Sequence, residues 1–236
     1  MNLILNSTNR LITSGCSYTE YAWPTWATYL GRHAHSNINV GRSGSDNAGI
    51  ARRVMDIVQP NDVVVILWSG FDRWNSYSDT PIFNPIDKDK NHWARRGCMN
   101  IRHKRFYVDH YHKVERFYTT MDYIKLIDCH SQANSYTAYH FSAFPLFLGE
   151  SEFELDQRLV EIYNKFSIAN NFLLDDNLED HKLQLKNDPE NWHPTPETHW
   201  SFFKNYMAPR LHIEVNDNFY LKDENDQAKQ IALDLH

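Results

Sequence analysis

The stretch Asp62–Trp68 constrains the fold more than any other part of this chain of 236 residues. After its first residue it reads Val-Val-Val-Ile-Leu-Trp, a β-prone run without a polar position. A strand with one face in water alternates apolar and polar residues, so an unbroken run indicates a strand that is buried on both faces. Such strands are typical of parallel sheets covered by helices on both sides, and the run therefore predicts an α/β protein.

The flanking segments continue the same alternation of strands and helices. Before the apolar run, we expect strands over 11–13 and 37–40 and helices over 24–30 and 46–58. After it, we expect a long amphipathic helix carrying Val114, Phe117, Met121, Ile124 and Ile127, then a strand over 136–141, a helix over 152–166, a strand over 171–174 and a helix over 194–211. This order predicts a flavodoxin-like three-layer sandwich with a central parallel sheet.

Composition and charge exclude several classes of protein. Hydrophobic residues make up 42% of the chain, which is enough for a packed core, and the net charge of -6 argues against nucleic acid as the main partner. The three cysteines, Cys16, Cys98 and Cys129, are too few for a disulfide framework and suggest reduced thiols. We find neither an apolar run near the roughly 20 residues that cross a bilayer nor a signal peptide, and we therefore expect a cytoplasmic protein.

We expect a single domain over 1–236 with an insertion at about 75–112 and a polar tail at about 212–236. Residues 87–116 hold nine Lys or Arg and four Asp or Glu, a local charge of +5 that leaves -11 for the rest. Aromatic residues lie among these charges: Trp93, Phe106, Tyr107 and Tyr111. This mixture suits a cover over a polar or anionic ligand, and it also suits a solvated surface loop.

His110 and His112, with Asp109 beside them, could ligate a metal ion. No third or fourth ligand follows at a recognisable spacing, however. We therefore expect no metal and no cofactor.

Small and polar residues follow each of the first three strands. Ser17, in Ser14-Gly15-Cys16-Ser17-Tyr18, could be a nucleophile, and Cys16 is a competing one. In the second turn, Gly44 could point its N–H at an oxyanion. In isolation, the first segment could also be an ordinary polar turn, and the second could equally be a glycine turn followed by a helix cap.

The third turn, Trp68-Ser69-Gly70-Phe71-Asp72-Arg73-Trp74, follows the buried strand. Residues at such a strand exit often line a site, although Asp72 and Arg73 could also form a surface pair.

His193 stands before Pro194 at the expected start of the last helix, with Glu190 three residues earlier and Asp188 five residues earlier. A histidine held by a stiff turn beside a carboxylate suits a general base, because the carboxylate orients the imidazole and stabilises its protonated form. The alternative is a structural histidine, since the chain has 13 histidines.

Taken in order along the chain, these motifs resemble the SGNH (GDSL-like) hydrolase superfamily of esterases, deacetylases and lipases. Gly15-Cys16-Ser17 looks like the first block of the family, with Cys16 where Asp is usual, and this likeness implies that Ser17 is the nucleophile. It also implies that the N–H of Gly44 serves the oxyanion hole, that His193 is the base and that Glu190 takes the place of the usual Asp. The resemblance covers residues 10–74 and 188–211 and is poor over the roughly 110 residues between.

The third block departs from the family pattern Gly-x-Asn-Asp, in which Asn donates to the oxyanion. Here Asp72 holds the Asn position, and a carboxylate donates only when it is protonated. Losing one such donor typically costs about 10²–10³ in turnover, unless Arg73 replaces it as a cationic donor.

The resemblance implies a serine ester hydrolase of the esterase or carbohydrate O-deacetylase type. A carbohydrate O-acyl ester is the expected substrate, because the residues expected around the site are polar and aromatic and do not form a long apolar surface. The alternative is a weak or inactive module of the same fold that binds a glycan or a nucleic acid. The family is common in bacteria and their phages, so a phage source is compatible with this chain.

Overall fold

The computed structural model describes the chain over residues 9–71, 73–83, 90–97, 112–144, 161, 172–178, 193–220, 226 and 230. Over 74–83, 90–97 and 172–177 and at 113 it describes the backbone alone. The helix expected over 152–166 lies, apart from residue 161, outside these ranges.

Five parallel strands form the central sheet, in the spatial order β2-β1-β3-β6-β7. The strands are β1 (Arg10–Gly15), β2 (Ser36–Asn39), β3 (Val63–Trp68), β6 (Thr137–Ser142) and β7 (Phe172–Asn177). If these five strands are numbered from 1 to 5 in chain order, their spatial order in the sheet is 2-1-3-4-5, which is the order of flavodoxin-like folds. All six residues of β3 are buried, as the apolar run predicted.

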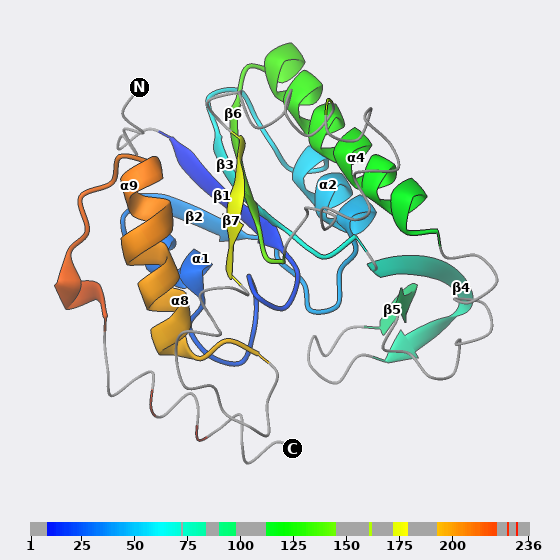
Figure 1. Ribbon diagram of the computed structural model, residues 1–236, viewed down its shortest axis with the longest axis horizontal. Helices are drawn as coiled ribbons and strands as arrows, with labels where there is room; N and C mark the ends of the chain where they lie inside the picture. The colour runs from blue at the N-terminus through cyan, green and yellow to red at the C-terminus, as the bar shows by residue number, and fades with distance from the viewer. Residues whose placement is uncertain are drawn as a thin grey trace.

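Helices cover both faces of this sheet (Figure 1). One layer holds α1 (Trp26–Gly31), α8 (Pro196–Phe202) and α9 (Ala208–Arg210), and the other holds α2 (Asn47–Met55) and α4 (Lys113–Asn134). The predicted three-layer sandwich is therefore confirmed. None of the helices in the described ranges combines the length and the apolarity that crossing a bilayer requires.

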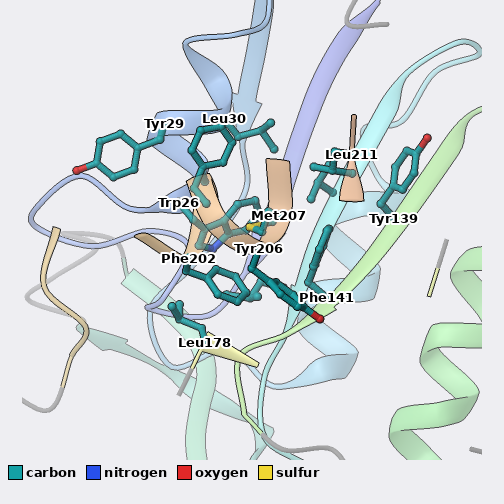
Figure 2. Close-up of a cluster of buried hydrophobic side chains, with 14 of the residues drawn as sticks. Trp26, Tyr29, Leu30, Tyr139, Phe141, Leu178, Phe202, Tyr206, Met207 and Leu211 are labelled. Atoms are coloured by element: carbon teal, nitrogen blue, oxygen red, sulfur yellow. The ribbon is translucent and has the colours of Figure 1, made fainter. Parts of the chain in front are cut away.

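Alternate residues of β3 serve the two layers. Val65 and Leu67 pack toward α1 and α8, whereas Ile66 and Trp68 pack toward α2 and α4. Figure 2 shows the aromatic-rich cluster on the first side, where Trp26, Phe141, Phe202, Tyr206 and Met207 are among the buried side chains. Burial of a large apolar side chain contributes about 1.5–3 kcal/mol, so this cluster holds α1 and α8 firmly to the sheet.

The last helix contains a π-helical segment, Phe203–Met207, between α8 and α9. Pro209 follows this segment closely. A proline inside a helix lacks an N–H and collides with the carbonyl four residues earlier, and a wider turn relieves that collision. The helix expected over 194–211 thus begins at Pro196 and ends at Arg210 without a break.

Two strands pair within the expected insertion. β4 (Arg73–Phe83) and β5 (Lys90–Gly97) form an antiparallel hairpin with a register shift between Tyr77 and Ile82. The hairpin lies beside the sandwich rather than in its sheet (Figure 1). The start of the expected polar tail also has structure. Phe219, in the short 3-10 helix Asp217–Phe219, packs on His33 just after α1, and Tyr220 packs on Tyr29 of α1 and Trp200 of α8.

A buried polar pair joins β3 and β6. The indole N–H of Trp68 donates to Nδ1 of His140 at 3.0 Å, and the two rings are nearly parallel. Because Nδ1 accepts this bond, the imidazole is neutral with its proton on Nε2. Burial lowers the pKa of His140 from 6.5 to about 3.

This pair predicts a loss of stability in mild acid. Between pH 6.5 and about 3 the unfolded chain binds a proton at His140 that the folded chain does not, so the free energy of unfolding falls as the pH falls. At pH 5 this difference amounts to about 2 kcal/mol. His140→Gln keeps an acceptor for Trp68 and cannot titrate, so it should lose less stability than the wild type between pH 7 and pH 5. Urea unfolding at both pH values measures this, and equal losses in the two proteins would contradict it.

Candidate functional site

The site begins where β1 ends, in a tight turn after Gly15. The N–H groups of Thr19 and Glu20 both donate to the carbonyl of Cys16, at 2.9 and 3.2 Å. A Cβ on Gly15 would lie 1.9 Å from Oγ1 of Thr19 and 2.8 Å from the carbonyl oxygen of Leu67. Glycine is therefore required at the point where the chain turns, and Ser17 follows it with 3% of its surface exposed.

Cys16 and Ser17 have different surroundings. Cys16 is fully buried and packs in the cluster between the sheet and the α1–α8 layer. A thiol packed among apolar side chains is a poor nucleophile, because a substrate cannot reach its sulfur. The structure thus disfavours the alternative in which Cys16 is the nucleophile.

The second turn lies against the first one. The N–H of Arg42 donates to the carbonyl of Gly15 at 3.1 Å, and Arg53 donates to Ser45 Oγ at 2.8 Å. Gly44 has a φ of 70°, a conformation that glycine adopts without strain. Asp46 accepts the N–H of Gly49 at 2.8 Å and caps the start of α2.

Asn47 is a residue that the sequence analysis missed. Its buried amide accepts the N–H of Ser69 at 2.9 Å and donates both to the carbonyl of Ser69 at 3.0 Å and to Oγ1 of Thr120 at 3.1 Å. These bonds fix the start of α2, just after Gly44, to the exit of β3. The available signal was an Asn in the first turn of an otherwise amphipathic helix.

The third turn is described in part, since Asp72 lies outside the described residues. The guanidinium of Arg73 lies over the ring of Phe144, with its Cζ 5.3 Å from the ring centroid. The carbonyl of Arg73 accepts a bond from Arg116 of α4 at 2.8 Å. Arg73 is thus held at the carboxyl end of the sheet, where a cationic donor would be needed.

The turn that contains His193 is held against the segment that leads into α1. The indole N–H of Trp23 donates to the carbonyl of Pro194 at 3.0 Å, and the hydroxyl of Tyr29 donates to the carbonyl of Pro196 at 3.3 Å. Both bonds are buried and span about 170 residues of sequence. They bring the last candidate motif to the first one.

His193 itself contacts the segment that follows Ser17. Its imidazole stacks on the ring of Tyr21 with a centroid distance of 4.0 Å, and the ring of Tyr18 meets it edge-on at 5.9 Å. Since Tyr18 is the residue directly after Ser17, the base candidate and the nucleophile candidate lie at the same end of the sheet.

Five rings form a continuous series across this end of the molecule, which we call the aromatic run. In order of contact they are Phe144, Tyr18, His193, Tyr21 and Trp23. The aromatic run connects the exits of β6 and β1 to the start of α8, and Arg73 covers its first ring.

A second histidine lies behind the first. His199 of α8 is buried, meets the edge of Tyr18 at 6.4 Å, and its Nδ1 has no hydrogen-bond partner within the described ranges. Burial, and to a smaller extent the charge of His193, lowers the pKa of His199 from 6.5 to about 3. His199 is therefore neutral near pH 7 and leaves His193 free of a like charge.

The described residues give no support to the alternative in which His110 and His112 bind a metal ion. His112 caps α4, where its Nδ1 accepts the N–H of Glu115 at 3.3 Å, and His110 lies outside the described ranges. No group of three or more His, Cys, Asp or Glu side chains that could hold a metal ion occurs in the part of the chain that is described.

The structure thus gathers Ser17, Gly44, Arg73 and His193 at the carboxyl end of the parallel sheet, where open α/β sheets bind their ligands. The acid candidate Glu190 lies outside the described residues, as does Asp72. Its predicted role therefore stays a prediction.

Comparison with known proteins agrees with this architecture. No family model matches the chain, and no curated protein gives a significant match. Among solved structures, TesA is similar at 14% identity, over 90% of this chain and 100% of that one, with a TM-score of 0.50. A protein of the G-D-S-L family from Desulfitobacterium hafniense DCB-2 (12% identity, 86% of this chain and 100% of that one, TM-score 0.48) and a GDSL-like lipase from Bacteroides thetaiotaomicron VPI-5482 (15%, 86% and 88%, 0.45) also match. The likeness to TesA concerns the fold, and it agrees with the SGNH-like fold that the motifs predicted.

The contact between Gly15 and Thr19 predicts that even one methyl group harms the first turn. Gly15→Ala places a Cβ against the backbone of β3, which cannot move easily, so we expect the free energy of unfolding to fall by about 1–3 kcal/mol. Gly49→Ala is a matched control, because Gly49 lies within α2, where alanine favours the helix. Chemical denaturation of both variants measures the difference in their free energies of unfolding. Equal stabilities would contradict the conclusion that glycine is required at position 15.

Proposed function

We propose that this protein is a serine ester hydrolase of the esterase or carbohydrate O-deacetylase type. Ser17 acts as the nucleophile, His193 as the general base and Glu190 as the acid that orients His193. The observation that carries the proposal is the contact of His193 with Tyr18 and Tyr21, in a chain with the fold of SGNH hydrolases.

In the first half of the reaction, Oγ of Ser17 attacks the ester carbonyl carbon while His193 takes the hydroxyl proton. The carbonyl oxygen becomes an oxyanion. When it collapses, the bond to the alcohol breaks and His193 returns the proton to the leaving oxygen, which leaves an acyl group on Ser17. Water, deprotonated by His193, then attacks the acyl group and releases the carboxylic acid together with free Ser17.

The oxyanion needs donors that are fixed before the reaction begins. The N–H groups of Ser17 and Gly44 take this role, and both stand in turns that hydrogen bonds tie to one another. Arg73 adds a positive charge at the same end of the sheet. This charge partly replaces the hydrogen bond to the oxyanion that Asn would donate in the third block.

The acyl ester of a carbohydrate is the substrate class that the site favours. A half-buried aromatic ring such as that of Phe144 offers a face on which a sugar ring stacks. The described side chains include one exposed large apolar residue, Leu126 on α4, and a lipid substrate would need more apolar surface than this. Acetyl groups on an oligosaccharide fit both features.

The proposal predicts that Ser17 carries the turnover of p-nitrophenyl acetate. Ser17→Ala should lower kcat/KM at least about 10³-fold, because the acyl-enzyme cannot form. Release of p-nitrophenol measures this rate, and a fluorophosphonate probe should label the wild type and not the variant.

Two variants make this test specific. Ser14→Ala removes another buried hydroxyl from β1, one that contacts Ile50 of α2, and it should keep activity within a few-fold. Cys16→Ala should still be labelled, whereas loss of labelling would favour the thiol as the nucleophile. A folded wild-type protein that neither turns over the ester nor accepts the probe would contradict the proposal and favour a module that only binds its ligand.

The substrate class has its own prediction. Acetylated xylo-oligosaccharides should release acetate faster than a triglyceride emulsion releases fatty acid, because the aromatic faces favour sugars. Titration of the released acid at constant pH measures both rates on one scale. Faster release from the triglyceride would overturn the carbohydrate assignment and leave the role of Ser17 in place.

A further inference from the structure

We infer that Tyr21 is a positioning residue, which holds the imidazole of His193 in its working orientation through ring stacking. This inference rests on the proposed function and extends it to a residue outside the expected nucleophile, base and acid. It starts from the aromatic run, in which Tyr21 occupies the place between Trp23 and His193.

The geometry leaves the imidazole little freedom to turn. The two rings of Tyr21 and His193 lie 4.0 Å apart at 22°, which is a stacked arrangement at close contact. On another side, the ring of Tyr18 meets the imidazole at 72°. A rotation of His193 about its side-chain bonds must therefore displace at least one tyrosine ring.

Tyr21 is itself held from behind. The ring of Trp23 meets it edge-on at 4.6 Å, and Trp23 is 5% exposed. The same indole donates its N–H to the carbonyl of Pro194, the residue after His193. Trp23 thus fixes both the backbone next to His193 and the ring that lies on its imidazole.

This arrangement serves the chemistry in two ways. A base must meet the hydroxyl of Ser17 within hydrogen-bond distance, and a misplacement of about 1 Å can cost about 10²-fold in rate. In addition, the imidazole becomes positively charged when it takes the proton, and the face of a phenol ring attracts a cation. Both effects act on the chemical step rather than on the binding of a small ester.

Kinetics with p-nitrophenyl acetate tests the assignment. Tyr21→Leu should lower kcat by about 2- to 10-fold, the size expected for the loss of one aromatic pair, and leave KM within about twofold. Tyr21→Phe keeps the ring and should stay within about twofold of the wild type in both constants. Tyr220→Leu is a matched control, because Tyr220 is a half-buried tyrosine that packs on Trp200 and Tyr29 instead of His193.

An NMR signature separates positioning from a general structural effect. A ring stacked on His193 should move the imidazole carbon-bound proton signals upfield, and the signals are identified by their absence in His193→Gln. The upfield position should persist in Tyr21→Phe and disappear in Tyr21→Leu. Wild-type signals at the position of an unstructured histidine would overturn the inference, and this measurement needs no variant at Tyr21 to fold.

The outcomes also separate this inference from the proposed function. An active wild type in which Tyr21→Leu changes neither kcat nor the His193 signals overturns the role of Tyr21 alone. A rise in KM with an unchanged kcat overturns it too, because Tyr21 would then contact the substrate. A wild type with upfield His193 signals and no turnover of the ester overturns the proposed function, and with it any catalytic role of the stack.

Discussion

Two buried hydrogen bonds join the beginning of this molecule to its end, and the candidate site depends on them. Trp23 and Tyr29 donate to the carbonyls of Pro194 and Pro196, which stand on either side of Thr195, the N-cap of α8. A buried indole or phenol that loses its acceptor costs about 1–3 kcal/mol, so these donors resist any shift of α8 along the sheet. The apolar cluster below them contributes most to the packing of α8 on the sheet. Burial of apolar surface has no preferred direction, so the cluster tolerates a small shift of α8 better than the hydrogen bonds do. The bonds thus decide where His193 lies, and the cluster decides that α8 packs there at all.

The sandwich could be predicted because its physical cause is local in the sequence. An unbroken apolar run identifies a doubly buried strand, and the helical spacing of Phe117, Met121 and Ile124 identifies the face that α4 buries. Other features have causes that periodicity does not contain. The π-helical turn before Pro209 relieves the clash of this proline with the carbonyl four residues earlier. The β4–β5 hairpin forms in a segment with no alternation of apolar and polar residues. The sequence analysis expected an insertion there and assigned it no strands, because pairing across a hairpin depends on the partner strand as much as on the strand itself.

The same distinction holds for the candidate site. Ser17, Gly44 and His193 could be predicted because each stands at a fixed place relative to a strand end or a proline, and because together they resemble a known set of motifs. The structure brings His193 beside the segment after Ser17. Asn47 and Tyr21 could not be found in this way, since their importance lies in partners that are remote in the sequence. An asparagine in a helix and a tyrosine in a loop are ordinary residues until the structure shows what they touch.

Under the proposed mechanism, the altered third block is related to the close packing of the turns that carry the backbone donors. A side-chain donor such as Asn can adjust to an oxyanion by rotating, whereas a backbone N–H points where the chain holds it. With Asp72 at the Asn position, the stabilisation of the oxyanion falls mainly on the N–H groups of Ser17 and Gly44. Donors of this kind are effective only if they need no reorganisation during the reaction. The close packing of Thr19 on Gly15 and the bonds between Asn47 and Ser69 immobilise the turns that carry these donors. A site with fewer donors thus compensates by holding the remaining ones more tightly, through contacts such as the bond between Arg42 and Gly15 and the bonds between Asn47 and Ser69.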